Sequence, residues 1–402
     1  MNQELVRRIA VTIGALLLFR LGSHVPLAGL VPQNSLLPGV NVGRISIFAL
    51  YLIPYLSAAI VIQLIAMVWG RLNALQRSGE AGRRKIARYT LVLTLVLTTF
   101  QAYGLASALV EITNLVADPG GWFVLSATAT MVGGVFFLIW LSELITRHGI
   151  GNGLALILAV SILISLPEDV ANIIEMLRRG MVSPNLVLLH VAFWVAFVAL
   201  IVLVESARRN VPIEFGARQL GKRLLPPRRT VLPIKLNSAG ALIPVTVAPW
   251  TWSLPLAIAA FVFGAREPWL VAAYEHMKFG QPAHLLLGAI AVFVLVFVYT
   301  SYVLDPERAA ATLQEQGGVI AGVAPGEATA DHLDRTVSLT TVLGAAYLAA
   351  VSLIPELFTA WGDMLLPYKI SGGSALIVVC TILDLQKQVR DLSLTTRGGE
   401  RK

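Results

Sequence analysis

Hydrophobic residues in this chain fall into ten long runs, separated by polar, basic or proline- and glycine-rich segments. A helix needs about 20 mainly apolar residues to cross the hydrocarbon core of a bilayer, and these runs approach or exceed that length. None shows the segments of about ten alternating residues typical of a membrane barrel. Because backbone groups in lipid must be hydrogen-bonded internally, the runs predict transmembrane helices. The predicted spans are residues 9–27, 45–67, 88–109, 122–143, 150–166, 185–204, 238–262, 284–304, 337–355 and 371–386.

The distribution of Lys and Arg predicts how these spans are oriented. The N-terminus, alternate connecting segments and the C-terminus hold 24 of the 31 Lys and Arg residues, whereas the other connections hold six. The remaining one, Arg20, lies within the first span. Since basic segments stay on the cytoplasmic side, both termini are predicted to be cytoplasmic, which agrees with an even number of spans.

The number of spans also suggests an internal division. Five spans fall in residues 1–180 and five in residues 181–402, where a long basic segment, residues 205–237, is predicted to be a cytoplasmic loop. An odd number of spans gives the halves opposite orientations, and inverted repeats of this kind place a functional pathway at their interface. The predicted fold class is an all-α integral membrane protein of ten transmembrane helices in two inverted five-helix halves.

Composition agrees with a membrane protein and excludes other classes. Charged residues make up 13% of the chain, against about 25% in a soluble domain, and the mean hydropathy is +0.75. The net charge of +8 would suggest nucleic acid in a soluble protein, but the basic residues here lie between spans, so no DNA partner is predicted. The single cysteine, Cys380, lies in an apolar run. No heme, iron–sulfur or zinc pattern occurs in the sequence, so no cofactor is predicted.

The sequence holds no pattern typical of a catalytic site, and the protein is not expected to be an enzyme. Its six histidines are scattered, and it contains no H-E-x-x-H, G-x-S-x-G or P-loop pattern. A small-solute transporter with an inverted repeat is the alternative from another class. Ion-coupled transporters carry ionisable residues within their spans. Here Glu143 and Glu205 lie near span ends, and Arg20, the deepest charge, is expected to snorkel or pair near the outer interface rather than to line an ion path.

Polar residues and prolines distinguish two of the predicted spans. Gln63 lies in the second span, and Asn237 opens the seventh. Ordinary hydrogen bonding between helices would account for either residue alone. Prolines free backbone carbonyls and let a helix bend, so two such helices could form a seam that opens. The prolines are Pro54 in the second span and Pro244, Pro249 and Pro255 in the seventh.

An ordered set of short strings goes beyond composition. These strings are Phe19-Arg20-Leu21-Gly22 with Pro26, Ser46-Ile47-Phe48-Ala49-Leu50 followed by Pro54-Tyr55, Gln63-Leu64, Gly79 to Ile86, Gly149 to Gly153, Leu232 to Asn237, Pro325-Gly326-Glu327 with Thr329, Leu353 to Glu356, and Gly372-Gly373-Ser374. In order and spacing, the set resembles the SecY family, the channel subunits of the bacterial Sec protein translocon. The resemblance extends from residue 7 to residue 390.

The resemblance implies a central pore between the two halves, closed by a ring of aliphatic side chains. An apolar ring that excludes water blocks ions without binding them. Because hydrophobic contact is non-directional, such a ring also grips an extended chain without sequence preference. The matching positions are Leu52 and Leu56 in the second span, Leu154 and Leu158 in the fifth, Ile377 in the tenth, and in the seventh Thr246, or Val245 if no residue is inserted near Ala241.

The resemblance further implies a lateral gate between the second and seventh spans, near which Gln63 and Asn237 fall. Through this gate, signal sequences and membrane segments would enter the membrane lipid. The implied function is a channel that translocates unfolded secretory polypeptides across the bacterial cytoplasmic (inner) membrane. The implied partners are the SecE and SecG subunits, the motor ATPase SecA, the ribosome and polypeptides that bear signal sequences.

The resemblance implies that the basic segment 205–237 corresponds to the cytoplasmic loop that the family uses to dock the ribosome or SecA. Arg binds RNA phosphates through paired hydrogen bonds, and a basic cluster steers association. Retention of the segment on the cytoplasmic side would account for the same charges. The expected docking residues are Arg218, Lys222, Arg223, Arg228 and Arg229.

The chain departs from the family pattern in two connections and in its short tails. The segment between Leu27 and Ile45 contains Pro32, Pro38, Gly39 and Gly43, which disfavour helix. The family's short plug helix is therefore expected to be absent or reduced to a loop. Ala324 stands where the family has an Arg before Pro325, which puts coupling to SecA or the ribosome in doubt. A non-conducting paralogue that acts in membrane-protein insertion also stays open as an alternative.

Overall fold

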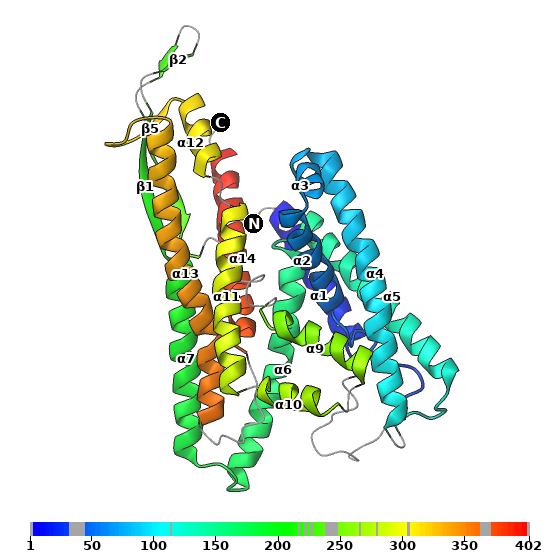
Figure 1. Cartoon of the computed structure of the whole chain (residues 1–402). Coiled ribbons are helices and arrows are strands. Elements are labelled where there is room, and N and C mark those ends of the chain that lie inside the picture. Colours follow the sequence, from blue (N-terminus) through cyan, green and yellow to red (C-terminus); the bar gives the residue numbers. More distant parts are fainter. Residues whose placement is uncertain are drawn as a thin grey trace. The chain divides into compact units, whose positions relative to one another are not determined.

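The computed structural model describes residues 3–31, 45–112, 115–215, 218–220, 223–225, 228–237, 248–264, 267–278, 280–303, 306–361 and 371–399. The chain forms two compact units, one of residues 1–164 with 381–402 and one of residues 165–380, and each is described by itself. Two helices run from one unit into the other (Figure 1): α6 (Gly153–Arg178) and α14 (Gly372–Gly399). The inverted halves 1–180 and 181–402 concern topology rather than compactness, and they stay a prediction.

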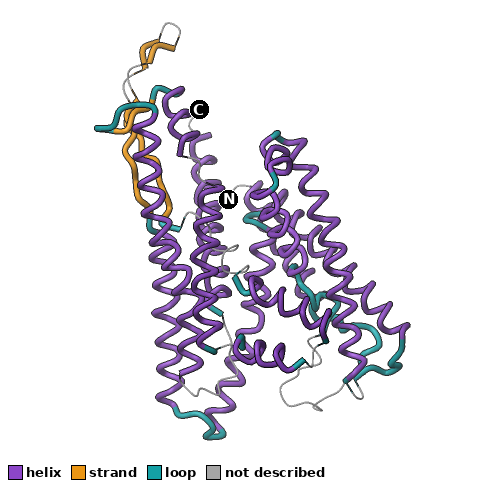
Figure 2. The backbone as a smooth tube through the Cα atoms, in the orientation of Figure 1, coloured by secondary structure: helices purple, strands orange, loops and turns teal. Residues whose placement is uncertain are grey.

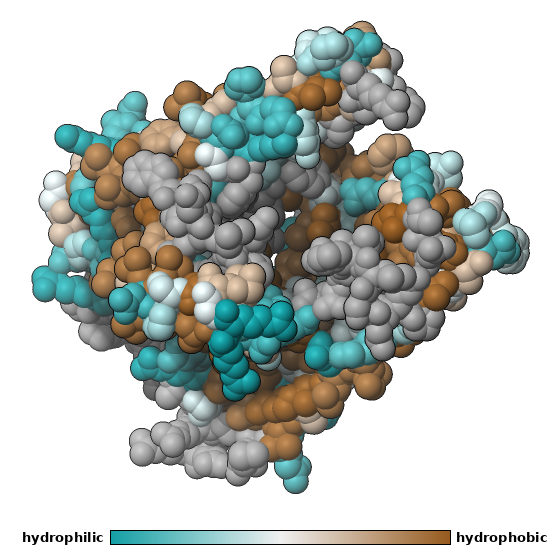
Figure 3. Space-filling view, turned by 90° about the horizontal axis from the view of Figure 1, so that it is seen from below, coloured by the Kyte–Doolittle hydropathy of each residue, from teal (hydrophilic) through white to brown (hydrophobic). Residues whose placement is uncertain are grey.

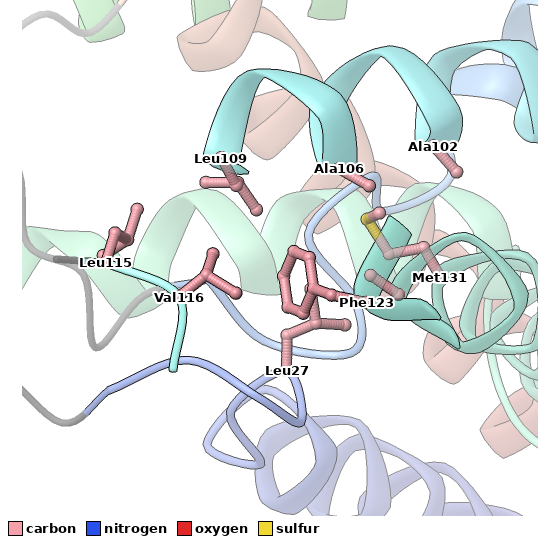
Figure 4. Close-up of a cluster of buried hydrophobic side chains, with 9 residues drawn as sticks. Leu27, Ala102, Ala106, Leu109, Leu115, Val116, Phe123 and Met131 are labelled. Atoms are coloured by element: carbon pink, nitrogen blue, oxygen red, sulfur yellow. The ribbon is translucent and has the colours of Figure 1, made fainter. Parts of the chain in front are cut away.

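The first unit is a bundle in which α4 packs along α5 and α2, and α1 packs against α5. Its helices are α1 (Gln3–Gly22), α2 (Ile53–Val68), α3 (Gly70–Arg77), α4 (Glu80–Glu111), α5 (Gly121–His148), most of the first half of α6 and the last part of α14. The connections between helices take part in its core. Leu27 and Leu115 are buried with Phe123 and Met131 of α5 in the cluster of Figure 4.

The second unit is built around α13, which packs along α11 and α12. The helices and strands of this unit, with these three included, are α7 (Pro184–Ser206), β1 (Arg208–Phe215), β2 (Arg218–Leu220), β3 (Arg223–Leu225), β4 (Arg228–Lys235), α9 (Trp250–Phe263), α10 (Pro268–His276), α11 (Pro282–Val303), α12 (Pro306–Glu315), β5 (Gly318–Ile320) and α13 (Glu327–Trp361).

The prediction of a helical membrane protein is confirmed. Each of the ten predicted spans contains a helix: α1, α2, α4, α5, α6, α7, α9, α11, α13 and α14. Six of the described helices, namely α4 to α7, α11 and α13, are long and apolar enough to cross a membrane, and α2 is a shorter apolar helix. Large hydrophobic side chains such as Phe100, Leu188 and Leu203 are exposed, and hydrophobic residues cover much of the surface seen in Figure 3. Lipid is the solvent that such a surface requires.

The second span begins later than the hydrophobic pattern predicts. Residues 47–52 form turns, and α2 begins at Ile53. Pro54 therefore lies in the first turn of the helix, where its missing N–H needs no partner, and it starts the helix rather than bending it. Pro249 likewise precedes α9, and Pro255 lies within it. Pro244 lies outside the described residues.

The basic segment 205–237 contains strands where the sequence predicted a loop. β1 pairs antiparallel with β4, from Arg208 opposite Lys235 to Phe215 opposite Arg228. β5, which comes from a different connection, pairs with the other edge of β1 and gives the sheet order β4-β1-β5. β2 and β3 pair separately. These strands, drawn in orange in Figure 2, lie at the N-terminal end of α13.

An alternating pattern explains why this segment forms a sheet. Val211 and Ile213 of β1 are buried, and the residues between and before them are exposed. Because side chains alternate across a strand, one face of β1 is apolar. Val211 packs with Ile234, Ile320, Ala310 of α12 and Leu333 of α13 in one buried cluster. The sheet is therefore held to the helices by an apolar face, and its other face is left to solvent.

Candidate functional site

Aromatic packing fixes the turn that carries the first of the predicted ring residues. The Phe48 ring stacks on Phe19 of α1, with centroids 6.1 Å apart, and on Phe137 of α5, with centroids 5.9 Å apart. Offset aromatic stacks at such distances are stabilising. Leu52 follows one turn later and is fully buried, and Leu56 N donates to Leu52 O at 3.0 Å. Leu52 and Leu56 therefore lie one turn apart, with Leu52 at the N-cap of α2.

A glycine-rich turn fixes the start of α6 and its two predicted ring residues. Asn152 caps the helix, because its Oδ1 accepts a hydrogen bond from Leu154 N at 3.0 Å. Leu158 lies one turn beyond Leu154 on the same face. Side chains of three other helices accept hydrogen bonds from the backbone of this turn: Thr12 from Ile150 N at 2.9 Å, Gln388 from Gly151 N at 2.8 Å, and Thr146 from Gly153 N at 2.9 Å.

A proline and a glycine bring the start of α14 against α13, just before Ile377. Pro355 lies inside α13, and a proline cannot donate to the carbonyl four residues earlier, which is that of Val351. Gly372 lies directly against this carbonyl: a Cβ at Gly372 would come within 1.6 Å of Val351 O. Only glycine permits so close an approach. The strings that carried the family resemblance at 353–356 and 372–374 therefore fit one another in space.

Three of the predicted ring residues, Leu52, Leu56 and Leu158, are buried. Leu56 and Leu158 are 9% and 8% exposed, and Ile377 is half-buried, as is Leu154. Thr246 and its alternative Val245 lie outside the described residues. Convergence of these side chains on one axis stays a prediction.

One predicted gate residue lies in a helix and the other directly follows the sheet, and the second has a partner that the sequence did not reveal. Gln63 lies in α2 and is half-buried. Asn237 is buried, and its Nδ2 donates to Glu205 Oε1 of α7 at 2.9 Å. The role of Gln63 and Asn237 in a lateral gate stays a prediction.

The predicted docking residues belong to the strands of the basic segment. Arg218 lies in β2, Arg223 in β3 and Arg228 in β4, and Lys222 lies outside the described residues. Arg229 is exposed and forms a salt bridge with Glu214 of β1, with 2.9 Å between Nε and Oε1. This pair joins two neighbouring strands, so Arg229 also has a local partner within the sheet. Exposed pairs of this kind stabilise little, by about 0 to 1 kcal/mol, and leave the guanidinium accessible to a partner.

The family's plug segment is only partly described. Pro32, Pro38, Gly39 and Gly43 lie outside the described residues, so the expected absence of a plug helix stays a prediction. The two ends of the segment are held together: Leu27 N donates to Ile45 O at 3.0 Å, and Ile47 N donates to Val25 O at 3.1 Å.

A buried carboxylate in the second unit was missed by the sequence analysis. Glu356 is 5% exposed, and its Oε1 accepts a hydrogen bond from Gly280 N at 2.6 Å. His284 Nε2 lies 3.4 Å from the same oxygen, and Trp252 packs edge-on against the His284 ring. The carboxylate thus ties the connection before α11 to α13. Its place directly after Pro355 was visible in the sequence, but its partners, more than 70 residues away, were not.

Replacing Glu356 with alanine is expected to lower the free energy of unfolding by about 1–3 kcal/mol, because the half-buried Gly280 N–H would lose its acceptor. Glu356→Gln keeps an oxygen at the same place and should retain most of the stability. Thermal unfolding of the purified variants in one lipid composition measures both. Equal losses for alanine and glutamine would contradict the assigned role of the hydrogen bond.

Fold and sequence together define a multi-pass helical membrane protein. The family model for SecY matches residues 46–386, and the chain belongs to the SecY family. The protein translocase subunit SecY of Escherichia coli (strain K12) is 36% identical over 414 residues, which cover 98% of this chain and 93% of the relative. That of Vibrio cholerae serotype O1 is 36% identical over 410 residues, covering 96% and 91%.

Solved structures share the fold. A SecY structure described by the plug domain that stabilises its closed state has a TM-score of 0.71 at 17% identity, covering 97% of this chain and 93% of the other. Sec61 in the canine ribosome–channel complex has a TM-score of 0.61 at 16% identity, with the same coverage. The curated relatives are named protein translocase subunits, and the structural neighbours are protein-conducting channels.

Proposed function

We propose that this chain is the channel subunit of a protein translocase. It conducts unfolded secretory polypeptides across the cytoplasmic membrane and releases membrane segments sideways into lipid. The observation that carries the proposal is the match over 98% of the chain to a protein translocase subunit SecY, together with the fold of a protein-conducting channel. The chain acts as a channel rather than as an enzyme, with energy supplied by a partner.

Aliphatic side chains perform the central task of such a channel. Leu52, Leu56, Leu154, Leu158 and Ile377, with Thr246 as the member from the seventh span, form the proposed ring. A narrow apolar ring dewets, which blocks ions while no polypeptide is present. A passing chain displaces no specific contact, because hydrophobic contact has no preferred direction. The ring can therefore pass polypeptides of any sequence.

Release into lipid needs a seam that opens at modest cost. Gln63 and Asn237 are the proposed polar residues of the gate, between the second and seventh spans. Hydrogen bonds between membrane helices are worth about 0.6 kcal/mol on average, so a hydrophobic signal helix can replace them. The polar seam thus keeps the gate shut until a client arrives.

The proposed partners are SecE, SecG, the motor ATPase SecA and the ribosome, with both termini of the chain in the cytoplasm. The sheet of β1, β4 and β5 supports docking, since Arg208, Arg209 and Arg229 are exposed on it. A rigid sheet presents these cations at fixed spacing, which a flexible loop would not. Paired hydrogen bonds from Arg suit phosphates of ribosomal RNA or carboxylates of a motor protein.

Reconstitution tests the proposal directly. The chain is co-purified with its SecE and SecG partners, placed in liposomes with SecA and ATP, and given a precursor that carries a signal sequence. Protection of the precursor from added protease is the expected result. A folded complex that binds SecA but protects no precursor would contradict a conducting role and favour a non-conducting paralogue. Uptake of a small solute without precursor would favour a transporter.

Replacing Ala324 with arginine is expected to raise SecA-driven transport about two- to fivefold, the size of effect that a charge at the rim of an interface has on association. The Ala324 side chain is exposed, and its carbonyl accepts a hydrogen bond from Thr329 Oγ1 at 2.8 Å, so the new side chain fits without disturbing the turn. Ala321→Arg, at an exposed position of the same connection, is the control. Normal expression without any gain from Ala324→Arg would argue that this connection does not dock the motor.

A further inference from the structure

A buried polar cluster lies where the sheet meets the start of the predicted seventh span. Asn237, 4% exposed, donates through Nδ2 to Glu205 Oε1 at 2.9 Å. Glu205 belongs to the last turn of α7, directly before the sheet. Tyr347 of α13 lies beside the Glu205 carboxylate. Among the described residues, Asn237 Oδ1 has no hydrogen-bond partner. The Glu205 carboxylate is therefore the identified hydrogen-bond partner that fixes the Asn237 side chain.

The backbone of the same segment is held on two further sides. Leu236 N donates to Ala207 O at 3.3 Å, which extends the ladder of β1 and β4 by one step toward the membrane-spanning part. α13 approaches from another side: a Cβ at Gly344 would lie 2.9 Å from Leu236 O and 3.6 Å from Asn237 Cα. Residues 236 and 237 are thus clamped between α7 and α13. Within this clamp, the Glu205 side chain makes the charged contact.

We propose that Glu205 is a positioning residue that joins the sheet to the seventh span by holding Asn237. This inference rests on the proposed function, in which the seventh span is one wall of the gate. A partner that displaces β1 and β4 moves Leu236 through the ladder and Asn237 through the Glu205 carboxylate. A hydrogen bond to an ionised acceptor is about twice as strong as a neutral one, so the contact transmits this movement. Glu205 thereby sets how readily the gate responds to a signal sequence.

Three substitutions separate positioning from general stability. Glu205→Ala removes the contact to Asn237. Glu205→Gln keeps an oxygen that can accept from Asn237 Nδ2 and should rescue in part, because a neutral acceptor makes a weaker hydrogen bond. Glu214→Ala removes a carboxylate of the same charge from the neighbouring strand β1, where it pairs with Arg229 and lies opposite that residue in the register, at the far end from Lys235.

The first measurement is amide hydrogen exchange of residues 203–210 and 228–237 in the full complex in lipid nanodiscs. Exchange at Leu236 should become several-fold faster in Glu205→Ala, because the clamp around its hydrogen bond loosens. Glu214→Ala should exchange like the wild type, and Glu205→Gln should lie between the wild type and Glu205→Ala. Unchanged exchange in Glu205→Ala would overturn the proposal, whether or not the channel transports.

The second measurement compares transport of two precursors, one with an intact and one with a weakened signal sequence. A signal sequence opens the gate only by binding the open state more tightly than the closed state. Loosening the seventh span makes the open state easier to reach, so a smaller difference in affinity suffices. The ratio of weakened to intact precursor should rise about tenfold or more in Glu205→Ala, the scale of a charged hydrogen bond. Asn237→Ala should do the same, and the double variant should add nothing further.

The outcomes are distinguishable. Equal loss of both precursors in Glu205→Ala, with an unchanged ratio, would show a structural role only and overturn the inference. Failure of the wild-type complex to transport either precursor would instead contradict the proposed function, and the exchange measurement would then decide on the clamp by itself.

Discussion

Gly134→Ala is expected to destabilise the protein strongly, whereas Gly133→Ala, one residue earlier in α5, is expected to be neutral or stabilising. A Cβ at Gly134 would lie 2.2 Å from Ile47 O and 3.2 Å from the Phe48 ring. Main-chain atoms cannot swing away as a flexible side chain can, so the turn before α2 must shift. Overpacking of a buried contact costs about 1–3 kcal/mol and occasionally more. The turn that carries Leu52 would move with it.

Gly133 is a matched control for this effect. A Cβ there meets nothing within 4 Å, and the residue is exposed in the same helix. Alanine at an exposed helix position is favoured over glycine by about 0.8–1 kcal/mol. Thermal unfolding and the yield of folded complex measure both variants. If Gly133→Ala and Gly134→Ala unfold at the same temperature, the close approach of α5 to Ile47 does not hold.

Replacing Leu158 with asparagine is expected to raise the ion leak of the idle channel about tenfold or more, since a barrier lowered by about 1.4 kcal/mol suffices for that factor. Leu158 is a member of the proposed apolar ring and follows Leu154 by one turn of α6. A polar amide in a narrow constriction holds water, and a hydrated constriction passes ions. Single-channel conductance in planar bilayers, without any precursor, is the direct measurement.

Leu158→Ile is the control, because it keeps the apolar volume and should leave the leak near that of the wild type. Each variant must be shown to be folded by its yield and unfolding temperature. A folded Leu158→Asn channel that leaks no more than the wild type would mean that Leu158 does not line the constriction.

The membrane-spanning part of the fold was predictable because lipid leaves the backbone few choices. Hydrophobic length alone gave ten helical segments, and each contains a helix. The start of the second span was not predictable in the same way, since Ile47, Phe48 and Leu50 are as apolar as the helix that follows. Their turn is stabilised by Phe19 and Phe137, which are distant in sequence.

The strands of the basic segment were not predicted, because its many charges are typical of a loop. The eight Lys and Arg residues of 205–237 suggest a solvent-exposed loop. The alternation of apolar Val211 and Ile213 with polar neighbours is the pattern that indicates a strand. Pairing of β1 with β5 joins residues about 100 positions apart, and the sequence pattern does not specify such a partner. The apolar face formed with α12 and α13 decides the register, because a slip of one residue would expose it.

The candidate site was predictable as a set of positions but not as a structure. Resemblance located the ring and gate residues, while the contacts that support them are tertiary. Val351 O and Gly372 meet because Pro355 leaves that carbonyl without a donor. Neither of the two sequence strings predicts contact with the other. Glu205 was noted only as a charge near a span end, and its contact with Asn237 depends on the sheet that brings residues 207 and 236 together.

Photo-crosslinking of a stalled secretory chain tests the central claim most directly. A photoreactive residue is placed at Leu56 or Leu158 of the proposed ring, and for comparison at Phe100, which is exposed on α4. A precursor held halfway through the channel should crosslink at Leu56 and Leu158 and not at Phe100. Crosslinks at Phe100 alone, or at none of the three while the precursor is protected from protease, would contradict a path through the aliphatic ring.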